Sequence, residues 1–151
     1  MPFYSRKPTR IPNFDYAQNY WYFVTVCTHN KACIFGNANE NNQIGKILEH
    51  HISMIQDHFT QVRVDKFVVM PNHFHAIVCL GDGSPSLPQV IGLLKSGVTR
   101  EIRKKFGLSN VWQRSFHDRI IRNQAEYEKI WSYIDTNPIR WDEDCFYIKG
   151  D

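Results

Sequence analysis

The order in which strand-like and helix-like patterns follow one another restricts the fold of this chain more than any other feature. Runs dense in aromatic and β-branched residues are typical of strands. Apolar residues recurring at three- and four-residue steps are typical of amphipathic helices. These patterns predict strands over 20–29, 62–70, 73–80 and 111–122, helices over 44–59 and 90–106, and a third helix capped by Asn123 and ended by Asn137-Pro138.

The first six predicted elements have the βαββαβ order of a ferredoxin-like α+β fold, in which two helices cover one face of an antiparallel sheet. The third helix has no place in that unit, so we expect it at an edge or on the far face of the sheet. Only Pro71 and Asn72 separate two of the strands. Because proline fixes φ near −65°, a primed two-residue turn is excluded, and we expect a slightly longer turn or a bulge.

Length and composition predict one globular domain over residues 1–151. Residues 1–19 of it are rich in proline, asparagine and basic side chains and are expected to form an N-terminal arm. Hydrophobic residues make up 42% of the chain and aromatic residues 14%, which excludes intrinsic disorder. The formal net charge of +3 is compatible with a nucleic-acid partner but does not require one.

Nothing in the sequence predicts a membrane partner, because no apolar run approaches the roughly 18 residues of a span. The first residues also lack the apolar segment of a signal peptide, so we expect a cytoplasmic protein. The cysteines have no CxxC spacing, which predicts reduced thiols rather than a zinc site. The four cysteines are Cys27, Cys33, Cys79 and Cys145. Cys27 and Cys79 stand in apolar runs and should be buried.

His73 and His75 are the first candidates for chemistry. Alternate residues of a strand point to the same side, so both imidazoles can meet one cation. The opposite side of this strand is apolar and should face the core, through Phe74, Ala76, Val78 and Leu80. Two ordinary histidines on a solvated face are an equally good interpretation of the pair alone. A metal site would also need a third ligand from elsewhere.

Tyr133 and Asn137 are the second pair of candidates. They stand four positions apart, hence on one flank of the third predicted helix, beside its buried stripe. A tyrosine hydroxyl can act as a covalent nucleophile when a divalent cation withdraws charge from a phosphate target. Periodicity alone favours plainer roles, namely a boundary tyrosine reaching water and an asparagine that ends a helix.

Three segments together resemble a known family. The HFH of 73–75 after VVMPN, WQRSFHDRIIRN at 112–123 and YIDTNP at 133–138 are similar to the HUH motif and tyrosine helix of the IS200-like Y1 transposases. Within that class they most resemble the REP-associated tyrosine transposases, the branch associated with repetitive extragenic palindromes. The resemblance extends from about Tyr20 to Trp141, and it implies a ferredoxin-like core with an added tyrosine-bearing helix.

The resemblance implies a transposase or endonuclease that cleaves and rejoins single-stranded DNA through a 5′-phosphotyrosine intermediate. Tyr133 would be the nucleophile, and His73 and His75 would bind Mg²⁺ or Mn²⁺. Asn137 stands where relatives place a third ligand, although some have the longer glutamine there. Tyr127 is a rival nucleophile, but it lies on the buried stripe. Relatives occur as monomers and as dimers that exchange tyrosine helices, so a homodimer stays open.

The partner implied by the resemblance is single-stranded or hairpin DNA, with the protein associated with the nucleoid. Basic side chains would contact phosphates and an aromatic ring would stack on bases. Arg114 is the strongest candidate, although any lone charge could instead be solvated surface. The full expected set is Lys95, Arg103, Lys104, Trp112, Arg114, Arg119 and Arg122.

Two other functions stay open at this point. One is a non-catalytic nucleic-acid-binding module on a ferredoxin-like sheet. Tyr22 and Phe23 in the first strand fit that class, but the neighbouring strand has histidines where stacking rings would be wanted. The other is a metal-dependent hydrolase that uses water, which a covalent protein–DNA adduct would exclude.

Overall fold

A computed structural model describes residues 20–141 of the chain, so the predicted arm over 1–19 and Cys145 lie outside the described residues. The predicted order of elements is confirmed. The elements are β1 (Tyr20–Cys27), a 3-10 turn η2 (His29–Lys31), α1 (Gln43–Ser53), α2 (Ile55–His58), β2 (Val62–Met70), β3 (His73–Leu80), α3 (Leu87–Phe106), β4 (His117–Ile120) and α4 (Gln124–Thr136).

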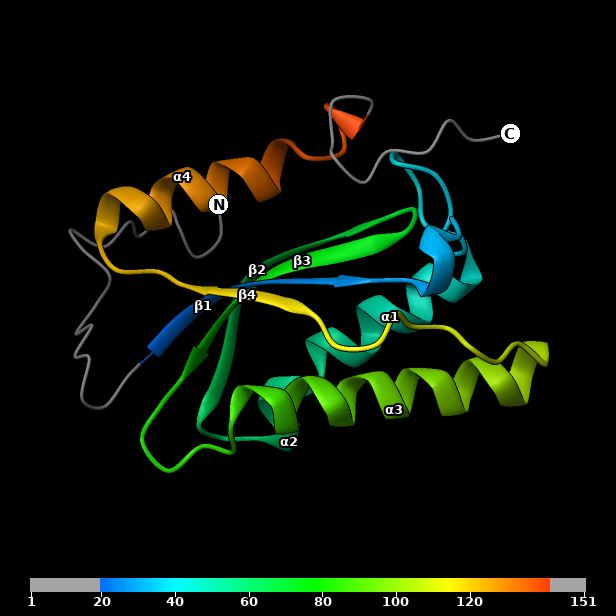
Figure 1. Cartoon of the computed structure of the whole chain (residues 1–151), viewed down its shortest axis with the longest axis horizontal. Coiled ribbons are helices and arrows are strands. Elements are labelled where there is room, and N and C mark those ends of the chain that lie inside the picture. Colours follow the sequence, from blue (N-terminus) through cyan, green and yellow to red (C-terminus); the bar gives the residue numbers. More distant parts are fainter. Residues whose placement is uncertain (1–19, 142–151) are drawn as a thin grey trace.

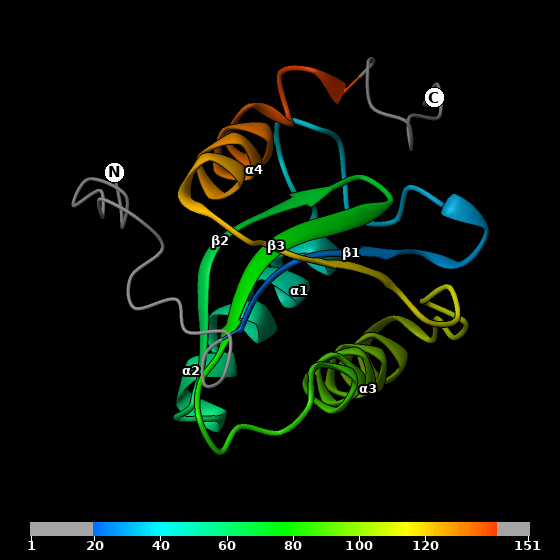
Figure 2. The ribbon, with the colours of Figure 1, turned by 60° about the vertical axis from the view of Figure 1, so that its left-hand side comes forward.

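The four strands of the described region form one antiparallel sheet in the order β2-β3-β1-β4, with β3 and β1 in the centre. This is the ferredoxin-like arrangement predicted from the element order. Helices α1, α2 and α3 cover one face of the sheet, and α4 lies across the other (Figures 1 and 2). The third predicted helix therefore packs on the far face, which gives the molecule three layers.

Each face of the sheet has its own hydrophobic core, because successive residues of a strand point to opposite sides. The core under α1 and α3 contains Val24 and Val26 of β1 and the predicted apolar side of β3: Phe74, Ala76, Val78 and Leu80. The smaller core under α4 contains Trp21, Ile77, Cys79, Ile121, Tyr127, Ile130 and Ile134. The predicted burial of Cys27 and Cys79 is confirmed.

Two predicted elements differ in extent from the structure. The strand predicted over 111–122 is regular only over His117–Ile120, because Ser115 has a φ of 69° that interrupts extended backbone before it. Trp112 makes a single isolated bridge to Thr28. The helix predicted over 44–59 is divided at Met54 into α1 and α2. One apolar stripe continues across the division, so periodicity alone could not detect it.

The connection between β2 and β3 is shorter than predicted. Met70 pairs directly with His73, so Pro71 and Asn72 form a two-residue turn. Neither residue has positive φ, so the turn is not primed. The backbone N–H groups of Phe35 and Thr28 donate to the carbonyls of Pro71 and Asn72, at 3.1 and 2.9 Å. These two hydrogen bonds from outside the hairpin stabilise the tight turn. The expected bulge is not at the turn, because the only register shift in the β2–β3 pairing falls between Val64 and Lys66.

Candidate metal and tyrosine site

The two histidines point to the same side of β3, as predicted, but they are not on a solvated face. Side chains of His73 and His75 are 0% and 1% exposed. Their Nε2 atoms are 3.1 Å apart, so both rings direct the same nitrogen toward one point. Ile77 and Cys79, which point to the same side of β3 as the histidines, belong to the core under α4. The histidines therefore lie on the face of the sheet that α4 covers (Figure 2).

The other nitrogen of each ring has a neighbour of its own. The Nδ1 atom of His73 lies 2.8 Å from Oδ1 of Asn72, and Nδ1 of His75 lies 2.8 Å from Oγ1 of Thr25. The Asn72 amide nitrogen donates to the carbonyl of Lys31 at 3.3 Å, so the amide oxygen is the atom that faces His73. Metal-binding histidines are ordinarily held by such partners at their second nitrogen.

Tyr133 of α4 lies beside this pair. Its ring centroid is 5.3 Å from that of His75 in an edge-on arrangement and 6.1 Å from that of Phe23. The tyrosine is 38% exposed, so part of the ring packs against His75 and Phe23 while another part is open to solvent. The structure thus brings the predicted nucleophile into contact with His75, one of the predicted metal ligands.

Asn137, at the end of α4, is 2% exposed. Its Oδ1 atom is buried and has no hydrogen-bond partner among residues 20–141. Leaving a buried carbonyl oxygen without a partner costs about 1–3 kcal/mol. In the chain Asn137 stands between Tyr133, which contacts His75, and Trp141, whose ring centroid is 6.1 Å from that of His73. A cation is one kind of partner that such an amide oxygen takes.

This donor set fits a divalent cation. Within residues 20–141 no group of three or more His, Cys, Asp or Glu side chains could hold a metal ion. A metal at this place therefore needs ligands of another type, and two imidazole nitrogens with an amide oxygen leave positions open for phosphate oxygens. Imidazole also suits several transition ions, so ligand type does not fix the metal.

Side-chain hydrogen bonds and an ion pair join α4 to strand β2, near the register shift in that strand. Tyr127 donates its hydroxyl to Oδ2 of Asp65 at 2.8 Å, and Arg63 donates to Oδ1 of the same carboxylate at 2.7 Å. Nearer the tyrosine, Lys66 of β2 pairs with Asp135 at 2.7 Å. Tyr127 is 0% exposed, so the rival nucleophile cannot reach a substrate in this conformation.

The predicted DNA-binding cations fall on different sides of the sheet. Arg119 pairs with Phe23 across β4 and β1, and strand alternation places it on the α4 face with Tyr133. Arg103 and Lys104 are exposed on α3, behind the opposite face. Arg114 and Arg122 are exposed in the segments before and after β4.

Lys95 and Trp112 have contacts that differ from the expected DNA contacts. The Lys95 ammonium donates to the backbone carbonyls of Gln113 and Ser115, at 3.0 and 2.9 Å, and burial lowers the pKa of this amine. Trp112 donates its indole N–H to the carbonyl of Lys95 at 3.2 Å. Its ring packs against those of Phe35 and Phe74. Stacking of Trp112 on DNA bases stays a prediction.

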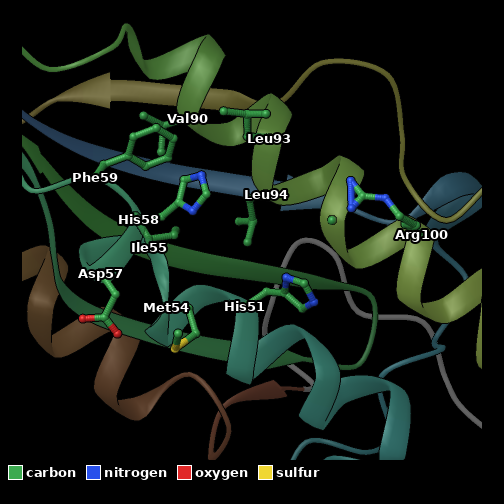
Figure 3. Close-up of a pocket in the computed structure, with 11 residues that line it drawn as sticks. His51, Met54, Ile55, Asp57, His58, Phe59, Val90, Leu93, Leu94 and Arg100 are labelled. Atoms are coloured by element: carbon green, nitrogen blue, oxygen red, sulfur yellow. The ribbon is translucent and has the colours of Figure 1, made fainter.

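A separate cavity of about 430 Å³ lies between α1, α2 and α3 (Figure 3). Its lining is mainly apolar, with Met54, Phe59, Leu93 and Leu94 among its residues. Neither His73 nor His75 lines it, because it occupies the opposite side of the sheet from α4. It is therefore not part of the candidate site.

Sequence reasoning missed Thr25 and Asn72. Asn72 stands immediately before His73 and was interpreted only as a turn residue. Thr25 is a buried hydroxyl residue within an otherwise hydrophobic strand, a pattern that can indicate a polar partner across the sheet. The register that places Thr25 opposite His75 is not readable from either strand by itself.

The comparisons with known proteins identify the family of the chain. Residues 16–137 match the family described as transposase IS200 like, so the chain belongs to that family. Among its relatives is a REP-associated tyrosine transposase of Escherichia coli, 30% identical over 70% of this chain and 66% of the relative. An uncharacterised protein of Haemophilus influenzae is 34% identical over 95% of this chain and 93% of its own length.

Solved structures show the same fold. A REP-associated tyrosine transposase bound to a REP hairpin superposes with a TM-score of 0.67 at 25% identity, covering 82% of this chain and 68% of that one. A putative transposase from Deinococcus radiodurans gives 0.58 at 15% identity, covering 78% and 90%, a likeness of fold alone. The resemblance drawn from the three sequence segments is confirmed. Among the described residues, none of the helices has the length and apolar character to cross a membrane.

Proposed function

We propose that this protein cleaves and rejoins single-stranded DNA through a covalent bond between Tyr133 and a 5′-phosphate. Mg²⁺ or Mn²⁺ would be held by His73, His75 and Asn137. The observation that carries the proposal is the contact between Tyr133 and His75, with ring centroids 5.3 Å apart, beside two Nε2 atoms that are 3.1 Å apart.

The reaction exchanges one phosphodiester bond for another. The Tyr133 oxygen bonds to phosphorus, the bond from phosphorus to the 3′ oxygen breaks, and that oxygen leaves as a 3′-hydroxyl after taking a proton. A bound divalent cation would withdraw charge from a phosphate oxygen, which compensates for the weak nucleophilicity of a phenol. Because the phosphotyrosine retains the bond energy, a new 3′-hydroxyl can reverse the step and rejoin a strand.

The proposed substrate is hairpin DNA with a single-stranded cleavage point. The solved relative bound to a REP hairpin supports this substrate class. Arg119, on the face that carries Tyr133, is the cation best placed to contact phosphates near the cleaved bond, with Arg114 and Arg122 extending the contact. Arg103 and Lys104 on α3 would contact more distant phosphates, whereas Lys95 would act through the loop it holds.

We also propose that Tyr133 acts on the metal site of its own chain. The hydrogen bond from Tyr127 to Asp65 and the ion pair between Lys66 and Asp135 join α4 to β2 of the same molecule. Ile130 and Ile134 are buried under the same helix. An exchange of tyrosine helices between two copies would form the same contacts with a partner chain, so a cleaving monomer in solution would support action within one chain and a cleaving dimer that exchanges α4 would contradict it.

The alternative functions have less support. A binding module has no need for two buried imidazoles converging beside a half-exposed tyrosine and an unsatisfied amide oxygen. A hydrolase that uses water has no need for the tyrosine. The two alternatives differ from the proposal in their products, so one experiment separates all three.

The test incubates the full chain and Mn²⁺ with a library of hairpin oligonucleotides whose loops and flanks are randomised. We expect a covalent adduct on a denaturing gel. Trypsin separates the two tyrosines of α4, because Lys129 lies between them: Tyr133 falls in the peptide 130–140 and Tyr127 in 123–129. An adduct on the peptide 130–140 supports the proposal, and one on 123–129 contradicts it. Cut DNA without adduct would identify a hydrolase, and retention without cutting a binding module.

A further inference from the structure

We infer that Asn72 and Thr25 are positioning residues: Asn72 holds the proton of His73 on Nδ1, and Thr25 accepts the His75 proton that moves to Nδ1 when a cation binds, so that both Nε2 atoms can serve one divalent cation. The inference rests on the proposed function, because it concerns the same metal site. It adds two residues that touch neither metal nor DNA and act through the imidazoles.

Asn72 determines the state of His73. Its amide nitrogen donates to the Lys31 carbonyl, so its Oδ1 atom faces His73 and can only accept a hydrogen bond. The Nδ1 atom of His73, 2.8 Å away, must therefore carry the proton. In a neutral imidazole the Nε2 atom then keeps its lone pair, which is the form a metal requires.

Thr25 gives His75 a choice between two states. A hydroxyl can donate or accept, so the 2.8 Å contact between Oγ1 and Nδ1 is compatible with either tautomer. With no cation bound, His73 offers a lone pair 3.1 Å from Nε2 of His75, which favours a proton on that Nε2 atom. A cation needs that lone pair, so the proton must move to Nδ1, where Thr25 accepts it.

Because Thr25 and His75 are both buried, the Thr25 hydroxyl affects which nitrogen of His75 carries the proton. Thr25 is 6% exposed and His75 is 1% exposed, so an N–H at Nδ1 depends on a protein acceptor. The pairing itself is set by the sheet, because Thr25 and His75 are direct partners in the β1–β3 ladder. Valine at this position would keep the shape of threonine and remove the acceptor, which would favour the tautomer that cannot bind metal.

The test measures Mn²⁺ binding to the full chain without DNA, using the electron paramagnetic resonance signal of free Mn²⁺. We expect Thr25→Val to weaken binding by about 10- to 100-fold, the range for loss of a partner behind a metal ligand. Thr25→Ser keeps the hydroxyl and should bind within about threefold of the unaltered chain, a margin well below that range. Thermal unfolding of both variants checks that the fold is retained.

A second measurement uses the unaltered chain, in case Thr25→Val does not fold. Histidine ¹⁵N shifts should place the His75 proton on Nε2 without metal and on Nδ1 with saturating Mg²⁺. A proton that stays on one nitrogen throughout would overturn the inference.

His73→Ala separates this inference from the proposed function. If that variant binds Mn²⁺ as well as the unaltered chain, the metal site itself is wrong. If it loses binding while Thr25→Val binds normally, the site stands and the positioning role of Thr25 is wrong.

Discussion

The rings of Tyr133 and His75 meet edge to face with centroids 5.3 Å apart, although one residue belongs to a central strand and the other to the last helix. The contact exists because α4 crosses the face of the sheet that bears the histidines. Phe23, on the strand next to β3, completes the surface beneath the tyrosine at 6.1 Å. The orientation of α4 therefore controls whether the site is assembled.

Tyr133→Phe should abolish the covalent adduct while leaving hairpin binding within about twofold, because it removes the attacking oxygen and keeps the ring contacts. Tyr127→Phe is the matched variant on the same helix. It should still form the adduct, and its free energy of unfolding should fall by about 1–2 kcal/mol through loss of the bond to Asp65. Gel assays and urea unfolding give the two readouts. Adduct formation by Tyr133→Phe would rule out this nucleophile.

Asn137→Ala should weaken Mn²⁺ binding by about tenfold or more if the amide oxygen is the third ligand. Without metal its stability should stay the same or rise, because the substitution removes a buried Oδ1 atom that has no hydrogen-bond partner among residues 20–141. Calorimetric titration measures the Mn²⁺ affinity, and thermal unfolding of the metal-free protein measures the stability. A clear loss of stability with unchanged metal binding would instead identify Asn137 as a structural helix-end residue.

Lys95→Met should lower hairpin affinity without changing its salt dependence, because Lys95 holds the carbonyls of Gln113 and Ser115 rather than a phosphate. Lys104→Met is the comparison, since Lys104 is exposed on the same helix. Loss of one direct contact to duplex phosphate should reduce the slope of log affinity against log salt by about 0.9. Hairpin affinity measured from low to moderate salt distinguishes the two variants. A reduced slope for Lys95→Met would contradict the proposal that Lys95 holds the loop.

Arg119→Gln should slow cleavage of DNA that is already bound, because Arg119 shares the α4 face with Tyr133. Arg103→Gln, on α3 behind the other face, should weaken binding and leave that rate unchanged. Single-turnover cleavage at saturating hairpin DNA measures the rate apart from the affinity. Equal rates for the two variants would mean that phosphates near the cleaved bond are not held by Arg119.

The sequence predicted the histidine pair well because strand alternation is a local property. Given a strand over 73–80, residues 73 and 75 must share a face, and residues 74, 76, 78 and 80 must occupy the other. The same argument could not say whether the histidine face was solvated, since that depends on where α4 packs. It also predicted β4 to be longer than it is, because the positive φ of Ser115 has no clear signal in the sequence.

What the sequence by itself determined was the order of the elements, the two-sided pattern of β3 and the family of the chain. Each of these depends on neighbours within a few residues or on motifs at fixed spacing. Only the tertiary structure decided that α4 buries the histidines, that Tyr133 reaches His75, and that Thr25 lies opposite the same ring. These contacts join residues far apart in the chain, and they follow from strand register and from packing between layers, which no local pattern encodes.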